Sequence, residues 1–143
     1  MSLYRGKAKI GGDGVEGSLI KRYDKYTAID TYQNDLIGYS MVQVLPETVG
    51  MCIDETDKNN KKVFCCDIIK IIPLYSTQNE LAVIKYGYHG LQPLSPTTIL
   101  GFYIDWLNKK LSYRQDIGYW FRNCSIEVVG NIIDNPEMLE GEK

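Results

Sequence analysis

The chain is a succession of short runs rich in Val, Ile, Tyr and Thr, separated by clusters of Gly, Asn, Asp and Pro. Residues of the first kind fit a pleated, half-buried surface, and residues of the second kind make turns. This rhythm predicts a mainly β fold of many short antiparallel strands rather than a few long helices. The expected strands cover residues 5–10, 16–21, 25–30, 38–44, 50–54, 62–65, 67–72, 81–88, 101–106 and 125–132.

Local signals mark the turns and the few helical segments. The run GGDG at residues 11–14 and the run DKNN at residues 57–60 tolerate positive φ, so both predict hairpin turns. Ser95-Pro96 and Asn135-Pro136-Glu137 have the form of a helix start, with an N-cap residue followed by proline. Residues 113–122 can also wind into a short helix.

Size and composition are those of one ordinary globular domain. A chain of 143 residues, 44% hydrophobic and 24% charged, can bury a single core, and no repeat or linker divides it. Its net charge of −2 lacks the broad positive field with which nonspecific DNA binders attract phosphate. Nucleic acid is therefore not the expected partner.

Neither a membrane span nor a secretory signal is apparent. No stretch approaches the about 18 consecutive apolar residues that cross a bilayer. The first residues lack the basic-then-apolar pattern of a signal peptide. We therefore expect no membrane partner and a cytoplasmic location.

Four cysteines occur, at positions 52, 65, 66 and 124. A chain of this size needs no covalent staple, and the spacing is not that of a disulfide framework, so we expect reduced thiols. A turn centred on residues 58–59 would place Cys52 opposite Cys65, which leaves a cross-strand thiol pair open. Zinc is not expected, because there is no CxxC motif and His89 is the only histidine. We expect no metal and no cofactor.

Few residues have the spacing that catalysis requires. A nucleophile needs an adjacent base, usually histidine, and only His89 could serve one of the cysteines. The carboxylates of Asp54, Glu55 and Asp57 fall in a predicted turn, where solvation keeps them ordinary. The sequence thus favours a protein that is not an enzyme. An enzyme that uses His89 with a cysteine or a carboxylate is the less favoured alternative.

Aromatic side chains gather in the later part of the chain, which has 11 tyrosines and 2 tryptophans in all. Tyrosine suits protein interfaces and also base stacking. In strand geometry Phe102, Ile104 and Trp106 share one face, and Tyr103 lies on the other. Ordinary core packing is the competing interpretation for Trp106 and Trp120, whereas the arginines are expected at the surface. The candidate binding residues are Tyr103, Trp106, Tyr113, Arg114, Tyr119, Trp120 and Arg122.

Two segments of the chain are more distinctive than the rest. The middle contains PETVG at residues 46–50, DKNNKKVF at 57–64 and DIIK at 67–70, and the end contains EVVGNIIDNPEML at 127–139. Together with RGKAK at 5–9 and EG at 16–17, these segments resemble the YopX-type phage proteins, while residues 73–118 diverge. The family has Glu-Gly before Asp67 where this chain has Cys65-Cys66. It also has a turn glycine where this chain has Asn60.

Several of these residues have structural interpretations of their own. Asp67 is expected to cap a turn through its carboxylate. Gly130 can allow a bulge or a close approach of backbone, and Asn131 and Asn135 can bond to the local backbone.

The resemblance implies a mostly β fold whose later part is similar to an SH3-type small barrel, encoded by a temperate phage or a prophage. It implies no reaction and no catalytic residues. On this basis we expect one domain over residues 4–140, with an N-terminal β extension over residues 4–48 and a barrel-like core over residues 49–139. Residues 140–143 are expected to be a frayed tail.

The favoured function is that of a non-enzymatic phage accessory protein in the host cytoplasm. It would act through contacts with a host or phage protein and could self-associate. A small barrel that binds single-stranded nucleic acid is the alternative, because exposed aromatic side chains stack bases. The acidic net charge disfavours that alternative.

Overall fold

The structure is a computed structural model, and it describes residues 3–21, 27–31, 41–73, 78–91, 95–108 and 114–139. The chain divides into two compact units, Met1–Cys52 and Ile53–Lys143, and each is described by itself. Antiparallel strands dominate the described residues of both units, so the predicted mainly β fold is confirmed. Tyr113 and the predicted tail lie outside the described residues.

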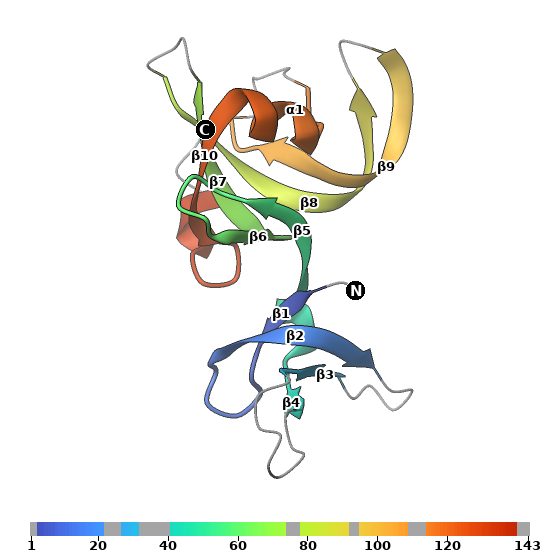
Figure 1. Cartoon of the computed structure of the whole chain (residues 1–143), viewed down its shortest axis with the longest axis vertical. Helices are drawn as coiled ribbons and strands as arrows, with labels where there is room; N and C mark the ends of the chain where they lie inside the picture. Colours follow the sequence, from blue (N-terminus) through green and yellow to red (C-terminus); the bar gives the residue numbers. More distant parts are fainter. Residues whose placement is uncertain are drawn as a thin grey trace. The chain divides into compact units, whose positions relative to one another are not determined.

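The first unit is a sheet of short antiparallel strands (Figure 1). Its elements are β1 (Tyr4–Lys7), β2 (Gly14–Lys21), β3 (Thr27–Asp30), β4 (Met41–Gln43), the 3-10 helix η1 (Pro46–Thr48) and the start of β5 (Gly50–Thr56). β1 lies between β2 and β5, and Tyr4 pairs with both Gly17 and Met51. The GGDG run forms the predicted turn between β1 and β2, where Gly11 and Gly12 have positive φ.

The second unit contains a four-stranded antiparallel sheet in the order β10-β7-β8-β9. Its elements are the end of β5, β6 (Lys62–Phe64), β7 (Asp67–Pro73), β8 (Glu80–Leu91), β9 (Ser95–Trp106), α1 (Ile117–Asn123), β10 (Cys124–Asn131) and the 3-10 helix η2 (Pro136–Leu139). The helical segments predicted around residues 113–122 and at Pro136 correspond to α1 and η2.

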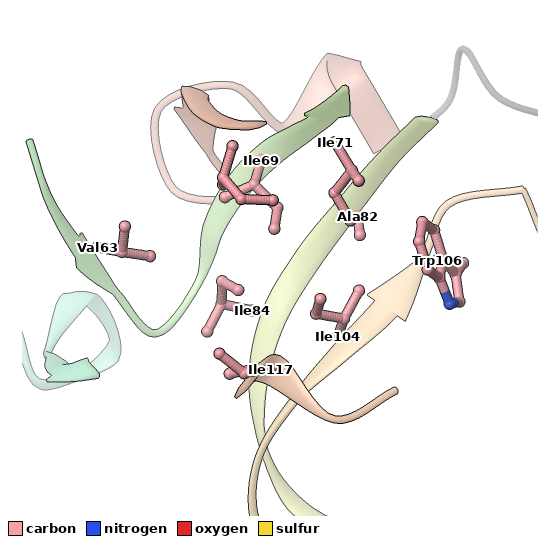
Figure 2. Close-up of a cluster of buried hydrophobic side chains, with 9 residues drawn as sticks. Val63, Ile69, Ile71, Ala82, Ile84, Ile104, Trp106 and Ile117 are labelled. Atoms are coloured by element: carbon pink, nitrogen blue, oxygen red, sulfur yellow. The ribbon is translucent and has the colours of Figure 1, made fainter. Parts of the chain in front are cut away.

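The main core covers one face of this sheet (Figure 2). Neighbouring strands contribute alternate side chains to it, and α1 adds Ile117 and the partly buried Trp120. A smaller cluster of Ile68, Val83 and Leu107 covers the opposite face. Because both faces are covered here, β7 has isoleucines on both faces, at positions 68 and 69 and at 71 and 72, and does not alternate strictly. The buried residues of the main core are Val63, Ile69, Ile71, Ala82, Ile84, Ile104, Trp106, Ile117 and Ile126.

The helix start predicted at Ser95-Pro96 is wrong. Ser95 begins β9 and pairs with Leu91, next to an irregularity in the register at Gly90. The long ladder with β8 outweighs a local capping signal, and proline is tolerated in an edge strand beside such an irregularity. Hydrogen bonding to a partner strand therefore decides this segment.

The SH3-type barrel is not confirmed. In the described part of the chain the four-stranded sheet is open, with β10 and β9 at its two ends. The outer side of β9 is met by the segment before α1 and not by another strand: Ile104 N donates to Gln115 O at 2.9 Å. This short segment occupies the edge of β9 to which another strand would have to pair in order to close a barrel.

The turn between β6 and β7 keeps positive φ without a glycine. Cys66 has φ +80°, and Asn60 has φ +63° in the preceding hairpin turn. Phe64 N donates to Asp67 Oδ2 at 2.8 Å, so the predicted cap by Asp67 is confirmed, with a fully buried carboxylate. The family's glycine is thus replaced here by a residue that must hold a strained backbone.

The interpretations of Gly130 and the asparagines are confirmed. The pairing of β10 with β7 shifts between Val128 and Gly130, and a Cβ at Gly130 would lie 2.6 Å from Asn135 Oδ1. That oxygen accepts a hydrogen bond from Asn131 N at 3.2 Å. Asn131 Oδ1 in turn accepts from the N–H groups of Ile133 and Asp134. Hydrogen bonds from the side chains of Asn131 and Asn135 to the local backbone therefore hold residues 131–135 in place.

Asp57 is not the solvated carboxylate that its turn position predicted. It is buried, and its oxygens accept backbone N–H groups of Asn59, Lys61 and, at 3.0 Å, Val128. Burial raises the pKa of Asp57, but these three hydrogen bonds and the charge of Lys61 together lower the pKa by more, so its net pKa is below the ordinary value. Asp57 thus joins the β5–β6 turn to β10, a partner that local sequence does not reveal.

The geometry of the same turn excludes the cross-strand pairing of Cys52 with Cys65. Asp57 N donates to Lys61 O at 2.9 Å, which centres the turn on Asn59. Pairing of Cys52 with Cys65 would require a turn centred between Lys58 and Asn59. No disulfide joins any of the four cysteines, all of which lie in the described ranges.

Candidate functional site

The β8–β9 hairpin is longer than the sheet that carries it. β7 pairs with β8 only from Glu80 to Val83, whereas β8 and β9 pair from Ala82 to Leu91. Residues 86–91 of β8 and their partners on β9 therefore form a two-stranded ribbon beyond the end of β7 (Figure 1). Among the described residues, no third strand lies beside this ribbon for its side chains to pack against.

One face of this ribbon is apolar and exposed. The ribbon face consists of the cross-strand pairs Tyr86–Phe102 and Tyr88–Leu100. Tyr88 is 77% exposed, Tyr86 55% and Leu100 52%. The rings of Tyr86 and Phe102 meet edge to face with centroids 5.2 Å apart, which holds Tyr86 in position. Large apolar side chains this exposed in one place are typical of interaction surfaces.

The ribbon is also uncharged. No Asp, Glu, Lys or Arg occurs in the sequence from residue 86 to residue 104. Exposed strands of natural proteins usually carry a charge or another device that prevents pairing with other chains. The ribbon face therefore combines exposed rings with the absence of charged side chains.

The opposite face of the hairpin is more polar. His89 is buried and stacks on Tyr103, with ring centroids 5.0 Å apart, and its Nδ1 lies 3.2 Å from Gly87 O. Its Nε2 has no hydrogen-bond partner among the described residues. Nearer the sheet, Lys85 Nζ bonds to Asp105 Oδ2 at 2.6 Å, and this bond raises the pKa of Lys85.

Two small cavities are lined by described residues of the second unit. One, of about 190 Å³, is lined by Val83, Lys85, Asp105, Leu107, Ile132 and Leu139. The other, of about 230 Å³, is lined by Thr56, Asp57, Lys58, Phe121, Cys124, Ser125 and Ile126. Both are smaller than the roughly 300 Å³ at which ligand pockets usually begin. Neither includes His89, and burial raises the pKa of the Cys124 thiol, which keeps it protonated at neutral pH.

Four of the predicted binding residues pack together around α1. Trp120 meets both Trp106 and Tyr119 edge to face, with centroids 5.2 and 4.9 Å away. Trp120 Nε1 donates to Arg114 O at 2.8 Å, and the Arg114 guanidinium lies 4.2 Å from the centre of the Tyr119 ring. The core interpretation is confirmed for Trp106, which is buried, and Trp120 packs against the same core.

Arg114 is held in place by Asp116. Its Nε and Nη2 donate to the two carboxylate oxygens at 2.6 and 2.7 Å. These bonds lower the pKa of Asp116. Arg114 is partly exposed and Arg122 is exposed, and the sequence predicted both at the surface.

The predicted binding residues do not form one surface. Phe102, Ile104 and Trp106 share the core face, as predicted, and Tyr103 lies with His89 on the other. The exposed rings of Tyr86 and Tyr88 were missed, because exposure depends on where β7 ends. The long uncharged stretch from residue 86 to residue 104 was the signal that could have found them.

In the ranges that the structure covers, no three His, Cys, Asp or Glu side chains gather to hold a metal ion. No helix among the described residues is long and apolar enough to span a membrane.

The chain matches the model of a known protein family. The family model described as YopX protein matches residues 10–140. Neither the curated proteins nor the solved structures gave a significant match. The matched range includes both of the distinctive segments and the whole β8–β9 hairpin. This chain therefore belongs to the YopX protein family.

Proposed function

We propose that this chain is a phage or prophage accessory protein that acts in the host cytoplasm by binding another protein through its ribbon face. The observation that carries the proposal is the exposure of Tyr86, Tyr88 and Leu100 on a ribbon without charged residues. Burial of apolar surface drives most protein association, and tyrosine is enriched where proteins meet. Membership of the YopX family supports the phage setting.

The geometry of the rings favours tight binding. A tyrosine has few rotatable bonds, so fixing it in an interface costs little conformational entropy. Tyr86 is already oriented by its edge contact with Phe102. Full burial of a large apolar side chain contributes about 1.5–3 kcal/mol.

Single-stranded nucleic acid is the second candidate, because exposed tyrosine rings can stack on bases. Phosphate, however, has to be neutralised by lysine or arginine. The ribbon offers neither between residues 86 and 104. We therefore rank this function below protein binding.

We propose no catalytic role. The buried position of His89, stacked on Tyr103, supports this choice. A general base must reach its substrate within hydrogen-bond distance.

The test is capture from host lysate with tagged protein, with and without nuclease, followed by mass spectrometry. The double variant Tyr86→Thr/Tyr88→Thr removes both rings and keeps residues that favour strands. The matched control is Ile10→Thr, because Ile10 is 92% exposed but lies in the β1–β2 turn of the first unit.

Three outcomes are informative. Proteins captured after nuclease by the wild type and by Ile10→Thr, but not by the double variant, would support the proposal. Equal capture by all three chains would remove the ribbon face from it. Capture that disappears on nuclease treatment would move nucleic-acid binding into first place.

A further inference from the structure

The cavity of about 190 Å³ lies on the opposite side of the sheet from the ribbon face. Lys85 lines this cavity and directly precedes Tyr86 in β8, so the two side chains point to opposite sides of the sheet. The apolar part of the lining consists of Val83, Leu107, Ile132 and Leu139. The cavity is therefore separate from the surface that we propose for binding a protein.

The size of the cavity fits one aliphatic side chain. A cavity of about 150 Å³ with a similar apolar lining, in another protein, admits a molecule as large as benzene. Val83 is 3% exposed and Leu107 is 7% exposed, so the apolar floor is closed, whereas Leu139 is 41% exposed at the rim. The space is too small for the larger ligands that fill most ligand pockets. A side chain as large as that of leucine would leave water for apolar contacts there.

An ion pair borders this apolar space. Lys85 Nζ donates to Asp105 Oδ2 at 2.6 Å, and both residues line the cavity. This bond uses one of the three N–H donors of the ammonium group, and a carboxylate can accept several hydrogen bonds. The two side chains are 45% and 24% exposed, so a ligand can reach both charged groups. The bond with Asp105 also raises the pKa of Lys85, which keeps the ammonium group charged at neutral pH.

We propose that this cavity binds the zwitterion of an α-amino acid with an aliphatic side chain as large as that of leucine. The carboxylate of the ligand accepts N–H groups of Lys85, and its ammonium group donates to Asp105. The side chain of the ligand fills the apolar part of the cavity. This inference goes beyond the proposed function, because it concerns another ligand and the other side of the sheet.

Charge complementarity selects this class of ligand. A fatty acid or an amine of the same size has one charge, which one member of the ion pair attracts and the other repels. A zwitterion places each of its charges beside the opposite member, so charge-assisted hydrogen bonds form at both ends. In an α-amino acid both charged groups are bonded to one carbon, so they lie about as close together as Lys85 Nζ and Asp105 Oδ2. An amino acid whose charges are farther apart cannot meet both partners.

The first test titrates the full chain with leucine and two analogues while methyl NMR spectra are recorded. Isocaproate keeps the aliphatic group and the carboxylate but lacks the ammonium group, and leucinamide lacks the carboxylate. Leucine should shift the methyl signals of Val83, Leu107 and Ile132, whereas the signal of Ile10 in the first unit should not move. Each analogue should bind at least about 10-fold more weakly than leucine, since one charge-assisted bond is lost and one repulsion remains.

Two results of this titration would overturn the inference. One is an unmoved Ile132 signal at about 10 mM leucine, because a site with a Kd of about 1 mM is then mostly occupied. The other is equal or tighter binding of isocaproate, which would make the ligand an apolar acid and not a zwitterion. Neither result depends on a variant, so failure to fold cannot cause it.

The second test compares two lysine variants by the same titration. Lys85→Met removes the cation of the site and keeps a long unbranched side chain. Lys70→Met is the matched control, because Lys70 also forms an ion pair, with Glu127 at 3.2 Å, and its side chain is 35% exposed. Lys85→Met should weaken leucine binding about 10-fold or more, and Lys70→Met should leave it unchanged. Equal binding by the two variants would contradict the role of Lys85.

Failure of this inference differs from failure of the proposed function. The double variant Tyr86→Thr/Tyr88→Thr should bind leucine as the wild type does, because both rings lie on the other side of the sheet. Loss of leucine binding in this folded variant would contradict a separate site. A wild-type chain that does not bind leucine but captures a protein through Tyr86 and Tyr88 would overturn this inference and still support the proposed function.

Discussion

Among single residues, Cys66 holds the most strained backbone of the turn before β7. A side chain at φ +80° costs about 1–2 kcal/mol relative to glycine. We expect Cys66→Gly to be more stable to urea than Cys66→Ala by about 1 kcal/mol. Both variants lose the thiol, so their difference isolates the backbone. Equal stabilities would mean that the turn relaxes without a cost.

Asp57 should make stability depend on pH in the acid range. Its folded pKa lies below the ordinary value, so its contribution is complete above the ordinary value and is lost as pH falls through the folded one. Asp57→Asn should lower the free energy of unfolding at pH 7 by about 1–3 kcal/mol, because an amide group cannot accept all three N–H groups. The measurement is urea unfolding at several values between about pH 7 and pH 3.

The control for Asp57 is Asp54→Asn, an exposed carboxylate three positions earlier in the chain. Asparagine also tolerates the positive φ of Asp54. Below about pH 4, the free energy of unfolding should fall less steeply with decreasing pH in Asp57→Asn than in the wild type. In Asp54→Asn it should fall as steeply as in the wild type. An unchanged slope in Asp57→Asn would contradict the role assigned to its hydrogen bonds.

Single residues were predictable where their partners are local. The cap by Asp67 and the bonds of Asn131 follow from neighbours within four positions. Asp57 was misread because one of its donors, Val128, lies 71 positions away. Only the pairing of β10 with β7 brings that donor into reach.

At the level of elements, the junction of β10 and η2 depends on Gly130. Gly130→Ala would place a methyl group 2.6 Å from Asn135 Oδ1 and 3.1 Å from Met138 Sδ. Moving Asn135 breaks its bond with Asn131 N, so we expect a loss of about 1–3 kcal/mol in the free energy of unfolding.

A double-mutant cycle checks the cause of that loss. In an Asn135→Ala background the side chain that blocks the methyl group is gone, so Gly130→Ala should cost clearly less. Urea unfolding of the four chains gives the coupling between the two sites. Additive losses would mean that Asn135 is not what resists the substitution.

The sequence predicted the existence of the strands better than it predicted where they end and what they pack against. Each of the ten expected strands overlaps a strand of the structure, because apolar and turn-forming residues alternate at a short period. The extent of β8 and β9 was underestimated, since residues 89–100 include Gly, Pro and His that are weak strand signals. Only their mutual pairing makes them a ribbon. The exposed rings of the candidate site were missed for the same reason.

For the molecule as a whole, capture of a partner through the ribbon face should be insensitive to salt. The ribbon carries no charged residue between positions 86 and 104, so this contact has no Coulomb attraction to screen. Capture at about 0.05 M and about 0.5 M NaCl should be equal or slightly greater at the higher value. Loss of the captured protein at the higher value would instead place charged groups in the contact.

The unit boundary has a consequence for how such a gene can change. The division between Cys52 and Ile53 falls inside β5, a strand that neighbours β1 on one side and β6 on the other. β1 pairs with β5 through Gly50 and Met51, which belong to the first unit. A crossover at this point keeps those pairs within one parent's segment. We expect a successful exchange to preserve the number of residues in β5, because one added or lost residue turns the following side chains to the opposite face.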